Sequence, residues 1–330
     1  MRKWMTWVAA CALLALAGCG GGGDGGSGGG PGFGDPRNGT YQAYATNGRV
    51  YEFTVNFDSG TYRMQGNGLN TSGVFTGGAS GTYAITGNER FRTAADLVVG
   101  GFNFGNGITS FVAARRYVTS MADLTHTFNG FGVNLSSTQP NATPNASRIF
   151  SSRFSAGTLQ SCTDNFIYTI ATCPTASVYT YTLSFNGSEI TGVDAAHGDT
   201  IRFRVARSGN LLIYLRAETP TGGVPSFRIG LPETNGLAGG TFIGASTVGN
   251  WATTTLTDTS YDIAGLRASG NNFSDAATLS ALGVNQPTGI RGGFRISDNG
   301  LLYLMQGGPL SVVVGASSVP TAGYIEIGLQ

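Results

Sequence analysis

The chain has 330 residues, of which 41% are hydrophobic and 11% are charged, and its formal net charge is +1 at pH 7. This hydrophobic content supports folded cores and excludes an intrinsically disordered protein, and so small a charge provides no basic patch for nucleic acid. The 53 glycines, together with short apolar runs rich in Thr, Val, Tyr and Phe, favour strands and turns over helices.

The amino terminus has the pattern of a targeting segment. Met1-Arg2-Lys3 is basic, and the apolar run Trp4–Leu16 that follows is too short to span a bilayer comfortably. The run ends in Leu16-Ala17-Gly18-Cys19, which resembles the lipobox of bacterial lipoproteins at every position. The resemblance implies that residues 1–18 are a signal peptide, and that Cys19 becomes the first mature residue and carries acyl chains such as palmitate on its sulfur and amino group. An ordinary secretory signal is the alternative.

The implied lipid anchor decides the expected location. Several acyl chains, each stabilising membrane binding by about 0.8 kcal/mol per buried CH₂, hold a protein stably on a membrane. Glycine, not aspartate, follows Cys19, which resembles lipoproteins of the outer membrane. We therefore expect a lipid-anchored protein of the cell envelope, at the outer membrane. Without Arg2 and Lys3, 17 of the 19 Lys and Arg remain against 18 Asp and Glu, so the mature chain also shows no basic excess for nucleic acid.

Residues 19–38 read as the lipidated cysteine and a linker. The stretch 20–34 is nearly all glycine, so it cannot bury a core and behaves as a flexible tether with a reach of roughly 20 Å. A phosphate-binding loop is the alternative, but such a loop lies between a strand and a helix, and neither is predicted beside this run. The tether is expected to hold the folded part off the lipid surface.

Three similar β units are predicted, at residues 39–120, 121–235 and 236–330. Each contains a Phe-Arg pair that leads within a few residues into an apolar strand, and two of the closing strands share Ile-Gly-Leu. Turn dipeptides such as Asn47-Gly48 separate the strands and supply the positive φ angles of tight hairpins. Since an open meander leaves exposed edges, each unit is predicted to close into a small antiparallel β-barrel or barrel-like meander. The fold class is therefore all-β, with three tandem units.

One short helix is expected within the third unit. Residues 274–283 begin with Ser-Asp, continue with an alanine-rich body and end in glycine, which are the features of a capped helix. We expect this segment to cover one end of the third barrel.

Two cysteines remain after the signal peptide and Cys19 are set aside. In an exported protein, Cys162 and Cys173 are predicted to form a disulfide that closes a loop of roughly 12 residues and stabilises by about 3 kcal/mol. Zinc is the alternative, and it would need two further ligands. His126 and His197, the two histidines of the chain, show no ligand spacing to these cysteines, so no metal is predicted.

Each unit also opens with Thr-Tyr or Thr-Phe and carries its arginine late. This pattern resembles the lipocalin-like barrels, in which an aromatic side chain of the first strand packs under an arginine of a late strand and closes one barrel end. The resemblance implies three ligand-binding or barrel-closing pairs: Tyr41 with Arg92, Phe128 with Arg204, and Phe242 with Arg295. Such a pair stabilises by about 0.5 to 2 kcal/mol. The alternative is that these arginines are outward, solvated positions.

The second unit is the best candidate for recognising an anionic molecule or a polymer, because it groups five arginines, Arg202, Arg204, Arg207, Arg216 and Arg228. The opposing interpretation is that these arginines pair with nearby carboxylates on a surface of mixed charge. The first and third barrels are expected to be filled by side chains.

The predicted function is that of a non-catalytic interaction or structural module of the envelope, with a protein or polymer partner. A lipocalin-like carrier of a small apolar or anionic ligand in the second unit is the alternative, and an empty pocket of several hundred Å³ lined by aromatic side chains would favour it. An envelope hydrolase is a remote alternative. Neither Ser80 nor Ser246 lies in a Gly-x-Ser-x-Gly elbow. A carboxylate pair for glycoside hydrolysis stays open, because the spacing that matters is spatial. No catalytic residue and no cofactor are predicted.

Overall fold

The computed structural model describes residues 34–330, except for 79–80, 140–141, 163–166, 221–222 and 317–321. Residues 34–330 form one compact unit. The predicted signal peptide, Cys19 and nearly all of the glycine tether lie outside the described residues. The described residues contain no helix that is long and apolar enough to cross a membrane.

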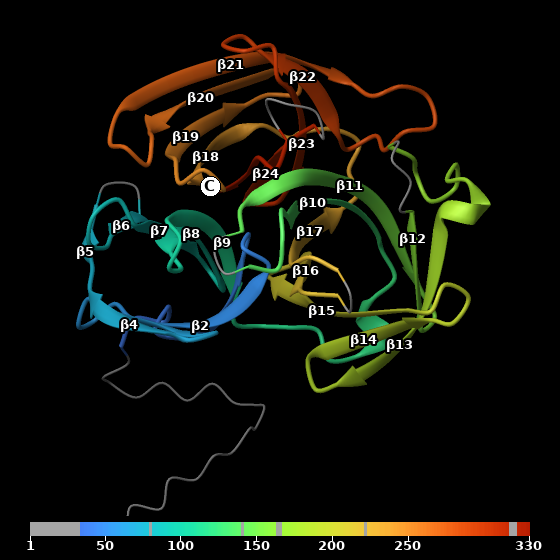
Figure 1. The fold of residues 1–330 in the computed structure, drawn as a ribbon, viewed down its shortest axis with the longest axis horizontal. Helices are drawn as coiled ribbons and strands as arrows, with labels where there is room; N and C mark the ends of the chain where they lie inside the picture. Colours follow the sequence, from blue (N-terminus) through green and yellow to red (C-terminus); the bar gives the residue numbers. More distant parts are fainter. Residues whose placement is uncertain (1–33, 79–80, 140–141, 163–166, 221–222, 317–321) are drawn as a thin grey trace, which may run out of the picture. The chain divides into compact units, whose positions relative to one another are not determined.

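The all-β fold class is confirmed. Antiparallel strands form three barrel or barrel-like sheets that follow one another along the chain, coloured blue to teal, green to yellow, and orange to red in Figure 1. Apart from strands, the described residues contain two single-turn 3₁₀ helices, η2 (Met121–Asp123) and η3 (Thr175–Ser177).

The first sheet has nine strands in the order β4-β3-β2-β1-β9-β8-β7-β6-β5. Its two edge strands, β4 and β5, are consecutive in the chain and separated by Phe75 alone. Aromatic rings pack its interior as expected; Phe53, for example, lies 5.4 Å from Phe91 and 5.6 Å from Phe111, centroid to centroid. The strands are β1 (Gly39–Ala45), β2 (Arg49–Asn56), β3 (Thr61–Gly66), β4 (Leu69–Val74), β5 (Thr76–Gly77), β6 (Thr82–Ala84), β7 (Arg90–Ala94), β8 (Leu97–Asn103) and β9 (Ile108–Ala114).

The second sheet is a closed barrel of eight strands in chain order, in which the last strand pairs with the first. Side chains alternate along each strand, so Phe203 and Val205 are buried inside while Arg202 is exposed outside. The strands are β10 (Thr127–Leu135), β11 (Pro144–Ser155), β12 (Thr158–Cys162), β13 (Val178–Asn186), β14 (Glu189–Asp194), β15 (Asp199–Ser208), β16 (Leu211–Glu218) and β17 (Ser226–Pro232).

The third sheet is likewise a closed barrel of eight strands. The expectation that side chains fill it is wrong, because a cavity of about 440 Å³ opens at one of its ends. Its strands are β18 (Gly240–Ser246), β19 (Trp251–Leu256), β20 (Ser260–Leu266), β21 (Asn272–Ala281), β22 (Arg291–Arg295), β23 (Leu301–Gly307), β24 (Leu310–Gly315) and β25 (Ile325–Leu329).

The helix predicted at residues 274–283 is wrong, because this segment forms most of strand β21. Its side chains alternate, with Ala277 and Leu279 buried and Thr278 exposed. Strand β21 pairs with β20 on one side and with β22 on the other. Two ladders of backbone hydrogen bonds and a buried apolar face outweigh the modest helix propensity of three alanines.

A shared apolar core joins the three sheets. It contains Tyr44 and Val112 of the first sheet, Phe227 and Ile229 of the second, and Ile327 of the third, all nearly inaccessible to solvent. These residues lie on the outer faces of their sheets, so β1, β9, β17 and β25 are buried on both faces. Because these apolar side chains face outward, the alternate side chains of the same strands point into the barrels. The residues of the candidate site, described next, include such inward side chains.

Candidate functional site

The interior of the second barrel is filled at one end and hollow at the other. A core that includes Phe128, Phe154 and Phe203 fills the first end. Toward the opposite end lies a cavity of about 470 Å³. At that end β10, β12, β14 and β16 finish, and β11, β13, β15 and β17 begin. A volume of this size is typical of a small-molecule site.

Three arginines form a row along one wall of the cavity. Across the paired strands, Arg148 of β11 lies opposite Gly132, Gly132 opposite Arg228 of β17, and Arg228 opposite Arg216 of β16. All three arginines line the cavity. Gly132 is essential to this arrangement, since a Cβ at its position would collide with Cδ of Arg228. The Arg228 side chain therefore lies across the backbone of β10 at Gly132, which has no side chain to block it.

The positive charge of this row is only partly neutralised. Arg216 forms an ion pair with Glu218. Among the described residues, no carboxylate lies within 4.0 Å of the guanidinium groups of Arg148 or Arg228. Arg228 instead donates to the carbonyl oxygens of Val133 and Phe227, at 2.8 Å each, and to Asn134 Oδ1 at 2.5 Å. These acceptors carry no formal charge, so the row retains a net positive charge.

The pKa of Arg228 is lowered to about 9. Burial is the main cause, and the positive charge of the neighbouring Arg216 lowers this pKa further. The side chain is still a cation at neutral pH. A partly buried cation without a counter-ion is costly, and an anionic ligand would supply the missing charge and accept charge-assisted hydrogen bonds from the guanidinium group.

Planar rings form part of the remaining wall. Phe150 lies over Gly130, where a Cβ would collide with the ring, and its centroid is 5.9 Å from that of Tyr214. At the rim, the rings of Tyr179 and His197 stack with centroids 4.0 Å apart. The cavity therefore joins a cationic row to flat aromatic surfaces.

The rim turn that carries His197 is held by a carboxylate. Asp194 accepts hydrogen bonds from the backbone N–H groups of Thr180, Ala196 and His197, at 2.7, 2.9 and 3.1 Å, and its Oδ2 lies 3.0 Å from Nδ1 of His197. Burial opposes ionisation of Asp194, but these hydrogen bonds outweigh it and lower its pKa. Asp194 is thus a structural carboxylate that fixes the stacked His197 ring.

The predicted disulfide is confirmed and lies at the same rim. Cys162, the last residue of β12, is bonded to Cys173, with Cα atoms 5.9 Å apart. The neighbouring Ser161 lines the cavity. Zinc ligation by these cysteines is thereby excluded in this structure, and the described residues hold no group of three or more His, Cys, Asp or Glu side chains suited to a metal ion.

No known family model matches this chain. A search of curated proteins likewise finds no significant match. The assignment of a function therefore rests on the geometry of the site.

The structure places Arg204 outside the cavity, so the predicted pair with Phe128 is wrong. Phe128 faces the interior of the second barrel, whereas Arg204 faces outward and its guanidinium lies 5.8 Å from the ring centroid of Tyr117. Arg204 also donates to the side chains of Gln42 and Tyr44 on β1. Its role in the described structure is to join the second barrel to the first sheet.

The other two predicted pairs are also wrong. The guanidinium over Tyr41 is that of Arg115, at 5.3 Å, and it follows β9, which pairs with β1. Arg92 neighbours the inward Phe91 and so points outward. In the third barrel, Arg295 lies 5.8 Å from the ring of Tyr324, while Phe242 is buried in the core. In the first sheet the last strand, β9, pairs with the first, β1, and this neighbourhood could have indicated Arg115.

Of the five arginines that the sequence groups in the second unit, two line the cavity, namely Arg216 and Arg228. Arg202 is exposed, and Arg207 forms an ion pair with Asp123 outside the cavity at 3.3 Å. Sequence reasoning missed Arg148. The signal for it was the alternation along β11, where Arg148 shares a face with Phe150, Ser152 and Phe154.

Proposed function

We propose that the second barrel binds a small anionic molecule that has a planar apolar part, and that the protein is a carrier or receptor for this molecule. The observation that carries the proposal is the row formed by Arg148, Arg216 and Arg228 in a cavity of about 470 Å³. The uncompensated cations supply the attraction for an anion, and the rings of Phe150 and Tyr214 supply flat apolar contact.

A binding role without catalysis agrees with the chemistry of the wall. Hydrogen bonds hold His197 to the turn through Asp194, and Tyr181 donates to Asp199 at 2.7 Å. Burial is the largest of the causes that raise the pKa of Tyr181, so its hydroxyl is a hydrogen-bond donor at neutral pH and not a nucleophile. We therefore propose a binding protein and not an enzyme.

The proposed location follows from the amino terminus. The resemblance of Leu16-Ala17-Gly18-Cys19 to a lipobox and the glycine tether after it support a lipid-anchored protein of the cell envelope, at the outer membrane. There the barrel would capture its ligand outside the cytoplasm and keep it at the membrane surface. Metabolic labelling with a palmitate analogue, compared between the natural chain and Cys19→Ala, tests the anchor independently of binding.

The test of binding is native mass spectrometry of the full chain, purified gently from the cells that produce it. We expect a stoichiometric small-molecule adduct that is retained in Arg202→Gln and lost in Arg148→Gln and Arg228→Gln. Arg202→Gln is the matched control, because this substitution removes the same charge from the outer face of the same barrel. An adduct that persists in both cavity variants, or bare protein in every preparation, would contradict the proposal.

A further inference from the structure

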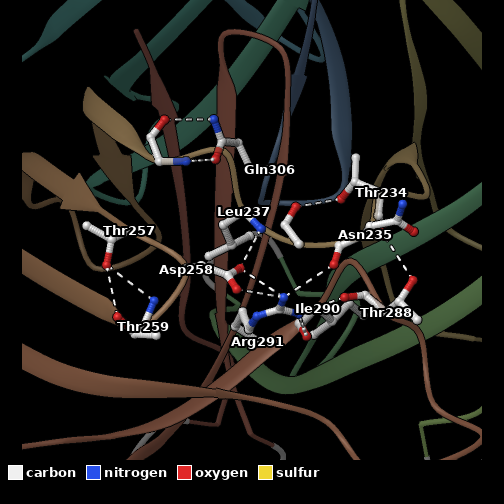
Figure 2. A network of polar contacts seen from close by, with 12 residues as sticks. Thr234, Asn235, Leu237, Thr257, Asp258, Thr259, Thr288, Ile290, Arg291 and Gln306 are labelled. Carbon is white, nitrogen blue, oxygen red and sulfur yellow. Dashed lines mark hydrogen bonds and ion pairs between the residues drawn. The ribbon is translucent and has the colours of Figure 1, made fainter.

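The third barrel is closed at one end by a polar network that its own chain supplies. Arg291 is buried and pairs with Asp258, with Nη2 2.9 Å from the carboxylate, and it donates to the carbonyl oxygens of Thr288 and Ile290. Figure 2 shows this network beside the paired contacts of Gln306 with the backbone at Gly239. Solvent access to the interior is therefore expected at the other end.

The cavity of about 440 Å³ lies toward that other end. Among its lining residues are Thr247 after β18, Asn250 before β19, and Arg295 at the end of β22. Tyr261 and Tyr324 also line it. The third barrel thus resembles the second in being packed at one end and hollow at the other.

A buried carboxyl group anchors the two tyrosines. Glu326 Oε2 accepts hydrogen bonds from Tyr324 at 2.7 Å and from Tyr261 at 3.1 Å, and its Oε1 accepts one from Thr254 at 2.5 Å. Glu326 is not among the residues that line the cavity. Its hydrogen bonds hold both tyrosine rings in place, so this part of the wall is rigid and aromatic.

One arginine at the cavity wall, Arg295, is paired with two carboxylates. Arg295 donates to Asp298, with Nε 3.0 Å from Oδ1, and its Nε lies 3.7 Å from Asp275 Oδ2. The Arg295 guanidinium lies 5.8 Å from the ring centroid of Tyr324, and that of Arg267 lies 5.2 Å from the ring centroid of Phe273. Two guanidinium groups and two carboxylates therefore line the cavity, and their formal charges cancel.

We propose that this cavity binds one unit of an uncharged sugar. The wall offers donors in Arg295 and Asn250 and acceptors in Asp275 and Asp298, which together suit hydroxyl groups that both donate and accept. A charged ligand would upset the balance of the ion pairs and leave a partly buried charge without a partner. The tyrosine rings supply a flat apolar surface for the ring face of a sugar.

This site differs from that of the second barrel in ligand class, and the proposal does not depend on the proposed function. Its test is ligand-observed saturation-transfer NMR on the purified full chain with glucose, galactose and N-acetylglucosamine. Glucuronate and choline serve as an anionic and a cationic comparison. We expect transfer to at least one of the neutral sugars, with weaker or no transfer to the charged molecules.

Two substitutions with the same change of charge locate the site. Asp275→Asn is expected to weaken binding of the neutral sugar at least tenfold, and Asp262→Asn, on the exposed face of the same hairpin, is expected to leave it unchanged. Asn250→Ala is a second cavity variant if Asp275→Asn fails to fold. Arg228→Gln, which alters the second barrel, should leave sugar binding intact. Absence of transfer to all three neutral sugars, tighter binding of glucuronate or choline, or equal binding by both aspartate variants would overturn the proposal.

Discussion

The first sheet and the second barrel are built from similar strands, yet one interior is packed with rings and the other is hollow at one end. In β2 and β7 of the first sheet, inward positions hold Phe53 and Phe91. In β10 of the second barrel, two successive inward positions after Phe128 hold Gly130 and Gly132. The number of strands fixes the space inside a barrel, and the sizes of the inward residues decide whether that space is filled. A ligand-binding site is therefore expected where the inward-facing residues are small.

The two interiors also differ in where they place charge. The first sheet keeps Arg92 outside, and Arg115 at its end pairs with Asp96 at 2.7 Å. The second barrel points Arg228 inward without a carboxylate partner within the described residues. A fold that serves stability alone gains nothing from an uncompensated, partly buried cation, so this difference in charge is why we propose binding for the second barrel and not for the first sheet.

The largest expected effect concerns the packed interior. Phe53→Ala should lower the free energy of unfolding by about 3 to 5 kcal/mol, because Phe53 is fully buried among other rings and leaves a cavity behind. Phe150→Ala in the second barrel should cost less than half as much, since Phe150 already borders empty space. Denaturation in guanidinium chloride measures both. Equal losses would show that the second interior is as tightly packed as the first.

The disulfide should matter next. It ties the open rim of the second barrel, whereas the first sheet has no cysteine among its described residues. Replacing both Cys162 and Cys173 by Ser should lower the free energy of unfolding by about 3 kcal/mol, the chain-entropy value for a loop of this length. Thermal unfolding of the natural chain with and without a reductant gives an independent value. No change in either experiment would contradict a stabilising role at the rim.

The rim carboxylate should make stability depend on pH. Asp194→Asn should cost on the order of 2 kcal/mol at pH 7, because three backbone N–H groups donate to the ionised group. The folded state lowers the pKa of Asp194 below its ordinary value of 3.8. The contribution is therefore complete above that value and is lost as the pH falls through the lowered pKa. Chemical denaturation of both proteins from pH 7 to pH 2 should show the difference shrinking only below about pH 4; a difference that stays constant would exclude ionisation as its cause.

The smallest effect has the opposite sign. Arg228→Met should raise the free energy of unfolding by about 1 kcal/mol, because it removes a partly buried cation that adjoins Arg216 and has only uncharged acceptors. The same variant should lose the stabilisation that added sulfate gives the natural chain. Denaturation with sulfate or chloride at equal ionic strength checks both statements. A variant that is less stable and responds normally to sulfate would show that the arginine is structural.

The sequence by itself determined the strands, the turns and the disulfide. Strands and turns could be predicted because their signals, alternating apolar residues and residues that adopt positive φ, depend only on neighbours along the chain. At the turn Asn47-Gly48, for example, Gly48 has a φ of 76°. Local pattern could not exclude a helix at residues 274–283, because the hydrogen bonds that make it a strand come from β20 and β22. The sequence repeats predicted the three units. The contacts of Arg204 and Arg295 could not be predicted, because they depend on which strands lie next to one another in the folded protein.

Only the tertiary structure decided which face of each strand points into its barrel. In β17, alternation separates Phe227 and Ile229 from Arg228, and a lone barrel would bury the two apolar residues inside. Here they enter the core shared by the three sheets, so Arg228 turns inward and meets Arg148 and Arg216 across neighbouring strands. Period-2 alternation shows which residues share a face, while the direction of that face depends on what packs against the outside of the barrel. The cationic cavity is a consequence of that packing.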